Sequence, residues 1–136
     1  DHEYWMDKAI AQAKLSNTPY GAVVVNQDDD FIEAYNTVAT DGATAHAEMN
    51  ALYKLQELNY EEAKNLTLYT TVEPCPMCMS AIVWAGIGTV VYGASIDDAA
   101  QFGNQIFISS DEVVKQSWYD AALIKGIKRD SCVQLF

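Results

Sequence analysis

Two short clusters in the sequence carry side chains that can bind a metal ion. His46 and Glu48 lie in the first cluster, and Cys75 and Cys78 lie in the second, within the run 73–78. Cysteines three residues apart lie on one face of a helix, and a helix N-terminus and a bound cation both favour the thiolate form. Sulfur ligands combined with imidazole select zinc. The sequence therefore predicts a zinc ion held by His46, Cys75 and Cys78.

The number of ligands separates a structural zinc site from a catalytic one. A structural zinc has four protein ligands, whereas a catalytic zinc has three and keeps one position for water. The spare candidates, His2 and Cys132, lie near the two ends of the sequence, so we expect three protein ligands and a water molecule. A fourth side chain would instead indicate a zinc-stabilised binding protein without turnover. A redox pair of cysteines is a further alternative, which the upstream histidine and the lack of a thioredoxin-like context disfavour.

Glu48 decides whether this metal site can be an active site. Residues two apart in a regular helix point roughly 200° away from each other, so Glu48 is not expected to be a ligand beside His46. It can reach water on the metal if His46 lies in an irregular first turn. Zinc lowers the pKa of that water to about 7, and a nearby carboxylate can take the proton and pass it to a leaving group. This chemistry is a hydrolytic attack on an electrophilic carbon, such as a ring carbon that bears an amino group.

Apolar periodicity and turn residues predict the elements that position these clusters. A cap at Thr44 or Asp41 and a proline at position 76 place a helix start near each cluster. Ser109 and Glu112 have the spacing of a capping box. The expected elements are helices over 3–15, 45–58, 76–85 and 110–124, a short helix within 94–103, strands over 21–25, 31–35, 66–71, 89–92 and 106–108, and a strand or a frayed end over 131–136. Strands that alternate with helices after an opening hairpin predict an α/β sandwich around a mixed sheet.

The length and the net charge of the chain indicate how many domains it has and which kinds of binding partner it disfavours. The 136 residues fit a single domain over 1–136, and 8 Lys+Arg against 19 Asp+Glu leave a net charge of −11. Residues 115–136 hold four basic and two acidic side chains, a local +2, so residues 1–114 carry −13. An excess of negative charge repels phosphate backbones, so we expect no nucleic-acid partner.

Hydropathy and cysteine content predict the compartment. No apolar run approaches the roughly 20 residues of a membrane span, and the first residues lack the order of a secretion signal. Three cysteines are an odd number, which disfavours a disulfide framework and favours a reduced compartment. We therefore expect a soluble, cytoplasmic protein with no membrane partner.

The two clusters together resemble the signature of zinc deaminases, His-x-Glu followed by Pro-Cys-x-x-Cys. In this sequence it is His46-Ala47-Glu48 and Pro74-Cys75-Pro76-Met77-Cys78. The chain resembles the cytidine deaminase superfamily over about residues 20–93. The resemblance implies a three-layer α/β/α sandwich with a central mixed sheet, zinc on His46, Cys75 and Cys78, Glu48 as proton shuttle, and a homodimer.

Within this superfamily, residues 19–23, 44–48 and 73–78 are most similar to bacterial guanine deaminases and related purine nucleobase or nucleoside deaminases. The resemblance implies a hydrolase that releases ammonia from a small nucleobase or nucleoside, with a guanine-type purine favoured. The substrate contacts expected from the resemblance and from the aromatic side chains are Asn36, Ala47, Tyr20 and Trp84.

Two alternative substrates stay open. The tRNA adenosine deaminases share the last two motifs, so adenosine in tRNA is one. The second is a cytosine- or triazine-type ring, because Asn104-Gln105-Ile106 stands where guanine deaminases place an acidic pair. A neutral amide reads a different pattern of donors and acceptors from a carboxylate.

Overall fold

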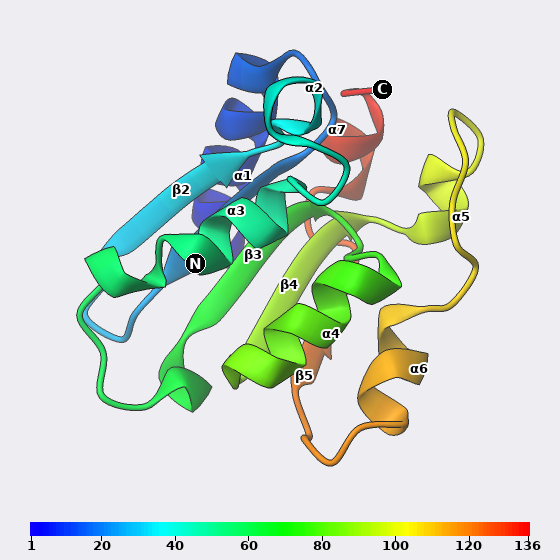
Figure 1. Cartoon of the computed structure of the whole chain (residues 1–136). Helices are drawn as coiled ribbons and strands as arrows, with labels where there is room; N and C mark the ends of the chain where they lie inside the picture. The colour runs from blue at the N-terminus through cyan, green and yellow to red at the C-terminus, as the bar shows by residue number, and fades with distance from the viewer.

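A computed structural model describes all 136 residues as alternating strands and helices (Figure 1). The helices are α1 (His2–Ser16), α2 (Val38–Asp41), α3 (Ala47–Tyr53), α4 (Pro76–Ala85), α5 (Ile96–Ala99), α6 (Ser110–Lys115) and α7 (Arg129–Val133), with single 3-10 turns η1 (Leu55–Glu57) and η2 (Ala63–Asn65). The strands are β1 (Gly21–Val25), β2 (Phe31–Tyr35), β3 (Thr67–Val72), β4 (Thr89–Ala94) and β5 (Ala122–Ile124). None of these helices combines the length and the apolar composition needed to cross a bilayer.

The five strands form one mixed sheet in the order β2-β1-β3-β4-β5. Strand β1 pairs antiparallel with both β2 and β3, whereas β3–β4 and β4–β5 pair parallel. Because β2 and β3 both run opposite to β1, they run parallel to each other. Their carboxyl ends therefore meet at the same edge of the sheet, which is the edge where open α/β sheets bind ligands.

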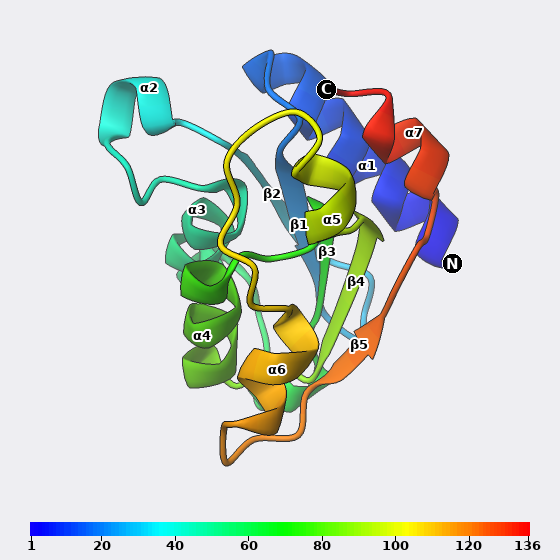
Figure 2. The same cartoon turned by 90° about the vertical axis from the view of Figure 1, so that its right-hand side faces the viewer.

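Helices cover both faces of the sheet and make three layers (Figure 2). Helices α3 and α4 lie on one face, and α1 and α7 lie on the other. Strand β1 is buried on both faces, so its side chains alternate between the two cores: Ala22 and Val24 face α3 and α4, whereas Val23 and Val25 face α1. The expected three-layer α/β/α sandwich with a central mixed sheet is confirmed.

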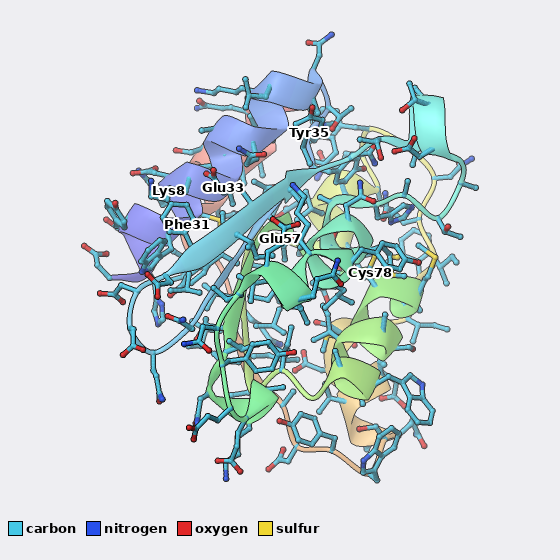
Figure 3. The ribbon with its side chains drawn as sticks, turned by 60° about the vertical axis from the view of Figure 1, so that its left-hand side comes forward. Lys8, Phe31, Glu33, Tyr35, Glu57 and Cys78 are labelled. Carbon is cyan, nitrogen blue, oxygen red and sulfur yellow. The ribbon has the colours of Figure 1, made fainter.

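Close packing of α1 on β1 depends on a glycine. A β-carbon at Gly21 would lie 2.0 Å from the Ala9 carbonyl oxygen and 2.5 Å from the Ala13 nitrogen. The helix backbone therefore sits directly on the first residue of the strand. At the other end of the strand pair, Lys8 from α1 extends over the Phe31 ring at the start of β2, 4.8 Å from its centroid (Figure 3).

Several expected boundaries are wrong, and tertiary contacts explain them. The helix expected over 45–58 begins at Ala47 with His46 as its N-cap, so neither Thr44 nor Asp41 caps it. The helix expected over 110–124 ends at Lys115, although Ser109 does cap it through the Glu112 amide. Residues 122–124 pair with β4 as β5 instead, a long-range pairing with the sheet that outweighs the local helical pattern.

The last two short elements also differ from expectation. Residues 106–108 are loop and pair with no strand. The segment expected as a strand or a frayed end over 131–136 contains α7. Helix α7 is held by Arg129, which binds the Asp98 carboxylate through two hydrogen bonds, and by Cys132, whose sulfur packs against Gly93 of β4.

Candidate active site

The two clusters meet at the carboxyl edge of β2 and β3. Helix α3 follows β2 after residues 36–46, and α4 follows β3 after residues 73–75, so both helix N-termini lie at this edge (Figure 1). Residue 46 is the N-cap of α3 and residue 75 is the N-cap of α4. Pro76 occupies the first helical position of α4, where its missing N–H costs no hydrogen bond. Cys78 lies one turn into α4, beside α3 (Figure 3).

His46, Cys75 and Cys78 form a group with the geometry of a zinc site. The His46 Nδ1 atom lies 3.6 Å from Cys75 Sγ and 3.5 Å from Cys78 Sγ, and the three ligand atoms all lie within 4.8 Å of one another. Tetrahedral zinc with Zn–S of about 2.3 Å and Zn–N of about 2.05 Å separates a sulfur from a nitrogen ligand by about 3.6 Å. The side chains present therefore fit zinc in both chemistry and spacing.

The two spare candidates for a fourth ligand lie elsewhere. His2 Nδ1 is 2.7 Å from the Tyr69 hydroxyl, and Cys132 belongs to the core between the sheet, α1 and α7. Neither side chain is part of the group formed by His46, Cys75 and Cys78. Three protein ligands match a catalytic zinc site, which keeps one position for water.

The contacts among the ligands favour a thiolate at Cys75 and a thiol at Cys78 in the metal-free chain. The hydrogen bond from Cys78 and the contact with the His46 imidazole together lower the pKa of Cys75 to about 4, against the effect of burial, which raises it. The same contact with Cys75 raises the pKa of Cys78, and a hydrogen bond with Cys75 raises the pKa of His46. One negative charge thus lies on Cys75, beside the Cys78 thiol and an imidazole, which favours capture of a divalent cation.

Glu48 lies in the first turn of α3 with only 5% of the residue exposed. Its separation of two residues from His46 does not turn it away from the ligands, because His46 has the extended backbone of an N-cap, with φ −67° and ψ 157°. Burial raises the pKa of Glu48 to about 7, and the charge of Cys75 raises it as well, while His46 lowers it. A carboxyl with a pKa near neutrality can both accept and release a proton at physiological pH.

Tyr20 lies close to Glu48 and Cys75, and its contact with a substrate stays a prediction. Burial raises the pKa of Tyr20 most, a hydrogen bond with Gln105 lowers it, and the charges of Glu48 and Cys75 raise it again. The Tyr20 ring also packs edge-on against Phe136, with centroids 6.0 Å apart. The hydroxyl of Tyr20 therefore lies near both the Glu48 carboxylate and the loop that contains Gln105.

The other three expected substrate contacts occupy different environments. Asn36 is half-buried, and its Oδ1 accepts a hydrogen bond from the Val38 amide at the start of α2. Ala47 is fully buried as the first residue of α3. The structure does not bring Trp84 to the metal-binding group, because it lies in the last turn of α4, 77% exposed, with its ring 4.6 Å from that of Trp118. An apolar cavity of about 390 Å³ near these two tryptophans contains none of the three ligands.

Gln105 and Glu73 were not predicted as site residues from the sequence. Gln105 approaches Tyr20 because loop 100–109 crosses toward it, and its signal in the sequence was the match of residues 104–106 to the position of the acidic pair in guanine deaminases. Glu73 directly precedes the Pro-Cys motif, and that position was its only signal.

Comparison with known proteins assigns the family. A family model described as the cytidine and deoxycytidylate deaminase zinc-binding region matches residues 1–94. The chain belongs to this family of zinc deaminases. The deaminase is therefore a zinc-dependent hydrolase that acts on C–N bonds, with His46, Cys75 and Cys78 placed to hold the metal.

Relatives of the deaminase differ in substrate. Guanine deaminase of Bacillus subtilis (strain 168) is 37% identical over 110 residues, which cover 76% of the deaminase and 70% of that protein. The tRNA-specific adenosine deaminase of Buchnera aphidicola subsp. Schizaphis graminum (strain Sg) is 31% identical over 140 residues, which cover 97% and 89%. A solved structure of guanine deaminase from Nitrosomonas europaea shares the fold, with a TM-score of 0.79, 23% identity, and coverage of 98% of the deaminase and 79% of that chain.

Proposed function

We propose that the deaminase hydrolyses the exocyclic amino group of a small purine base of the guanine type and releases ammonia. The observation that carries this proposal is the buried carboxyl of Glu48 beside three zinc ligands, with a half-buried tyrosine next to it. The similarity to a guanine deaminase at 37% identity supports the purine as substrate.

Glu48 moves the protons of the reaction. Bound zinc supplies Lewis-acid chemistry that lowers the pKa of a water molecule to about 7. Glu48 accepts a proton from the attacking water, whose oxygen forms the new bond to the ring carbon. The carboxyl then donates that proton to the neighbouring ring nitrogen and transfers the second proton of the water to the departing amine, so the C–N bond breaks and ammonia leaves. One water is consumed for each ammonia released.

Tyr20, Gln105 and Asn36 are the polar side chains that we assign to substrate binding, together with backbone groups of Ala47. The Gln105 amide has both a donor and an acceptor, as a purine edge does. The Oδ1 atom of Asn36 accepts a hydrogen bond from the Val38 amide, and the NH₂ group of Asn36 takes no part in that bond. Trp84 has no part in this assignment because it lies at the far end of α4.

The positions of the basic side chains speak against tRNA as the substrate. Residues 115–136 hold the local positive charge, yet three of these four cations already have acidic partners within the chain. Lys125 pairs with an exposed aspartate of α6, Lys128 Nζ lies 2.7 Å from Asp7, and Arg129 binds Asp98. Paired cations attract a phosphate backbone less than free ones, and the net charge of −11 repels it.

An ammonia-release screen tests the proposal directly. The zinc-loaded protein is assayed against guanine, adenine and cytosine, their nucleosides, a triazine amine, and an anticodon stem-loop that contains adenosine. We expect guanine to give the highest kcat/KM. Conversion of the stem-loop with a steep loss of activity at raised salt would replace this proposal with tRNA deamination.

We also propose that the protein is a homodimer, in line with the resemblance to dimeric deaminases. Sedimentation equilibrium should return twice the 15.0 kDa mass of the chain. A single species at the mass of one chain at micromolar concentration would contradict this.

A further inference from the structure

Glu73 is a buried carboxylate that binds the start of two helices at once. It follows the last residue of β3 and is 7% exposed. Its Oε1 accepts a hydrogen bond from the Ile96 amide at 3.0 Å, at the start of α5. Its Oε2 accepts two from Ser110, the first residue of α6, through the amide at 2.9 Å and the hydroxyl at 2.8 Å. Charge-assisted bonds of this kind are stronger than neutral ones.

The first part of the segment between these two anchors, α5, is also held by the hydrogen bonds of Arg129 to Asp98 and by the burial of Ala99, whereas loop 100–109 after it has few such contacts. The backbone hydrogen bonds of loop 100–109 stay within α5, the loop and α6. Its residues 101–109 are exposed except for Gln105, which is half-buried. The side-chain contacts that reach the rest of the chain include the stack of Phe102 on Phe136, with centroids 4.9 Å apart, and Phe136 in turn packs edge-on against Tyr20, which Gln105 approaches. Glu73 therefore joins the starts of the two helices that flank the loop, and the middle of the loop lies close to Tyr20.

We propose that Glu73 is a positioning residue that holds the starts of α5 and α6, the two helices that flank loop 100–109, and so keeps Gln105 close to Tyr20, where the loop sets the affinity for the purine. Glu73 lies two residues before the ligand Cys75, so the turn that presents a zinc ligand also anchors the substrate loop. The effect on substrate affinity rests on the proposed function, whereas the effect on the loop does not.

Glu73→Gln changes the hydrogen bonds of residue 73 while it keeps the volume of the side chain. The amide keeps one acceptor oxygen and turns an NH₂ group toward a backbone N–H, so one of the two anchors is lost. Ser110→Ala is the milder variant, because it removes only the hydroxyl bond to Glu73 and keeps the amide bond. Tyr92→Phe is the matched control, since it removes a neighbouring buried hydroxyl that contacts Ser110 and leaves both anchors intact.

Limited chymotrypsin digestion of the zinc-loaded protein reports on the loop without using activity. Cleavage after Phe102 or Phe107, identified by mass spectrometry, should be about tenfold faster in Glu73→Gln, because loss of a charged hydrogen bond lowers the cost of local opening by about that factor. Cleavage after other aromatic residues and zinc content should match the wild type. Ser110→Ala should give a smaller acceleration in the same loop, and Tyr92→Phe should give none.

Steady-state kinetics with the best substrate of the ammonia screen give the second readout. We expect KM to rise about tenfold in Glu73→Gln while kcat falls by less, because the loop binds the ring and Glu48 performs the proton transfers. The proposal is overturned if the loop of Glu73→Gln is cleaved at the same rate as that of the wild type. It is also overturned if cleavage accelerates equally at all sites and the variant loses zinc. If Glu73→Gln does not fold, the same readouts on Ser110→Ala decide it. If the screen finds no purine substrate, the proposed function fails while the digestion still tests the effect of Glu73 on the loop.

Discussion

Replacement of Glu48 by glutamine should remove activity while it stabilises the metal-free protein. Glutamine keeps the shape of the side chain but cannot carry a proton between water, ring nitrogen and amine. General acid–base catalysis contributes about 10²–10⁴-fold to a rate. Because Glu48 serves every proton transfer of the proposed reaction, we expect a loss of kcat of about 10⁴-fold, equivalent to about 5 kcal/mol of transition-state stabilisation.

The gain in stability follows from the cost of burying the carboxylate. Burial raises the pKa of Glu48 from its ordinary value of 4.5 to about 7. Below pH 4.5 the carboxyl is protonated in both the native and the unfolded chain. Between pH 4.5 and 7 the unfolded chain ionises while the native chain keeps its proton, so the free energy of unfolding falls as the pH rises. At 1.36 kcal/mol per tenfold change in the equilibrium, the decrease is about 3 kcal/mol above pH 7. Glutamine does not titrate, so the variant avoids this decrease.

Two measurements check both halves of this prediction. Ammonia release by the zinc-loaded variant gives the loss of kcat, with zinc content measured on the same sample. Urea denaturation of the metal-free wild type and of Glu48→Gln at pH 4 and pH 8 gives the stability difference, which should be near zero at pH 4 and about 3 kcal/mol in favour of the variant at pH 8. A variant that deaminates at a rate comparable to the wild type would refute the role of Glu48. A variant less stable than the wild type at pH 8 would refute the assignment of a costly buried carboxyl.

Three further predictions test the metal site and the fold. Cys78→Ser should lose bound zinc by elemental analysis, whereas Cys132→Ser, the matched control in the opposite core, should keep it. Arg129→Met should lower the urea midpoint at pH 7, because it removes two hydrogen bonds to a buried aspartate. The arginine holds the pKa of that aspartate below its usual 3.8, so the urea midpoints of wild type and variant should converge as the pH falls through that value; a constant difference would contradict this. Gly21→Ala should destabilise the protein by about 3 kcal/mol in thermal unfolding, since the added carbon would lie 2.0 Å from a helix carbonyl. Gly103→Ala meets no atom within 4 Å and should be neutral; similar losses at both glycines would refute the packing argument.

Local rules predicted the elements whose signals lie within the elements themselves. The hairpin strands over 21–25 and 31–35 form with the expected bounds, and α4 begins at Pro76 and ends at Gly86, which adopts the left-handed conformation of a helix C-cap. The helix expected over 110–124 was wrong because its second half is held by distant partners. The Tyr119 hydroxyl donates to the Gly86 carbonyl at 2.7 Å, and residues 122–124 pair with β4.

The types and spacing of a few residues determined the chemistry of this protein. Two cysteines three apart and a histidine define the metal ligands, and a glutamate two residues after the histidine supplies the proposed proton carrier, because ligand softness and proton affinity are properties of the side chains themselves. Only the tertiary structure decided that these residues meet. The antiparallel position of β1 brings the ends of β2 and β3 to one edge, and the extended backbone of His46 lets Glu48 lie beside the ligands. It also decided that Trp84 lies away from the site and that Glu73 and Gln105 lie near it, because such contacts depend on how distant elements pack.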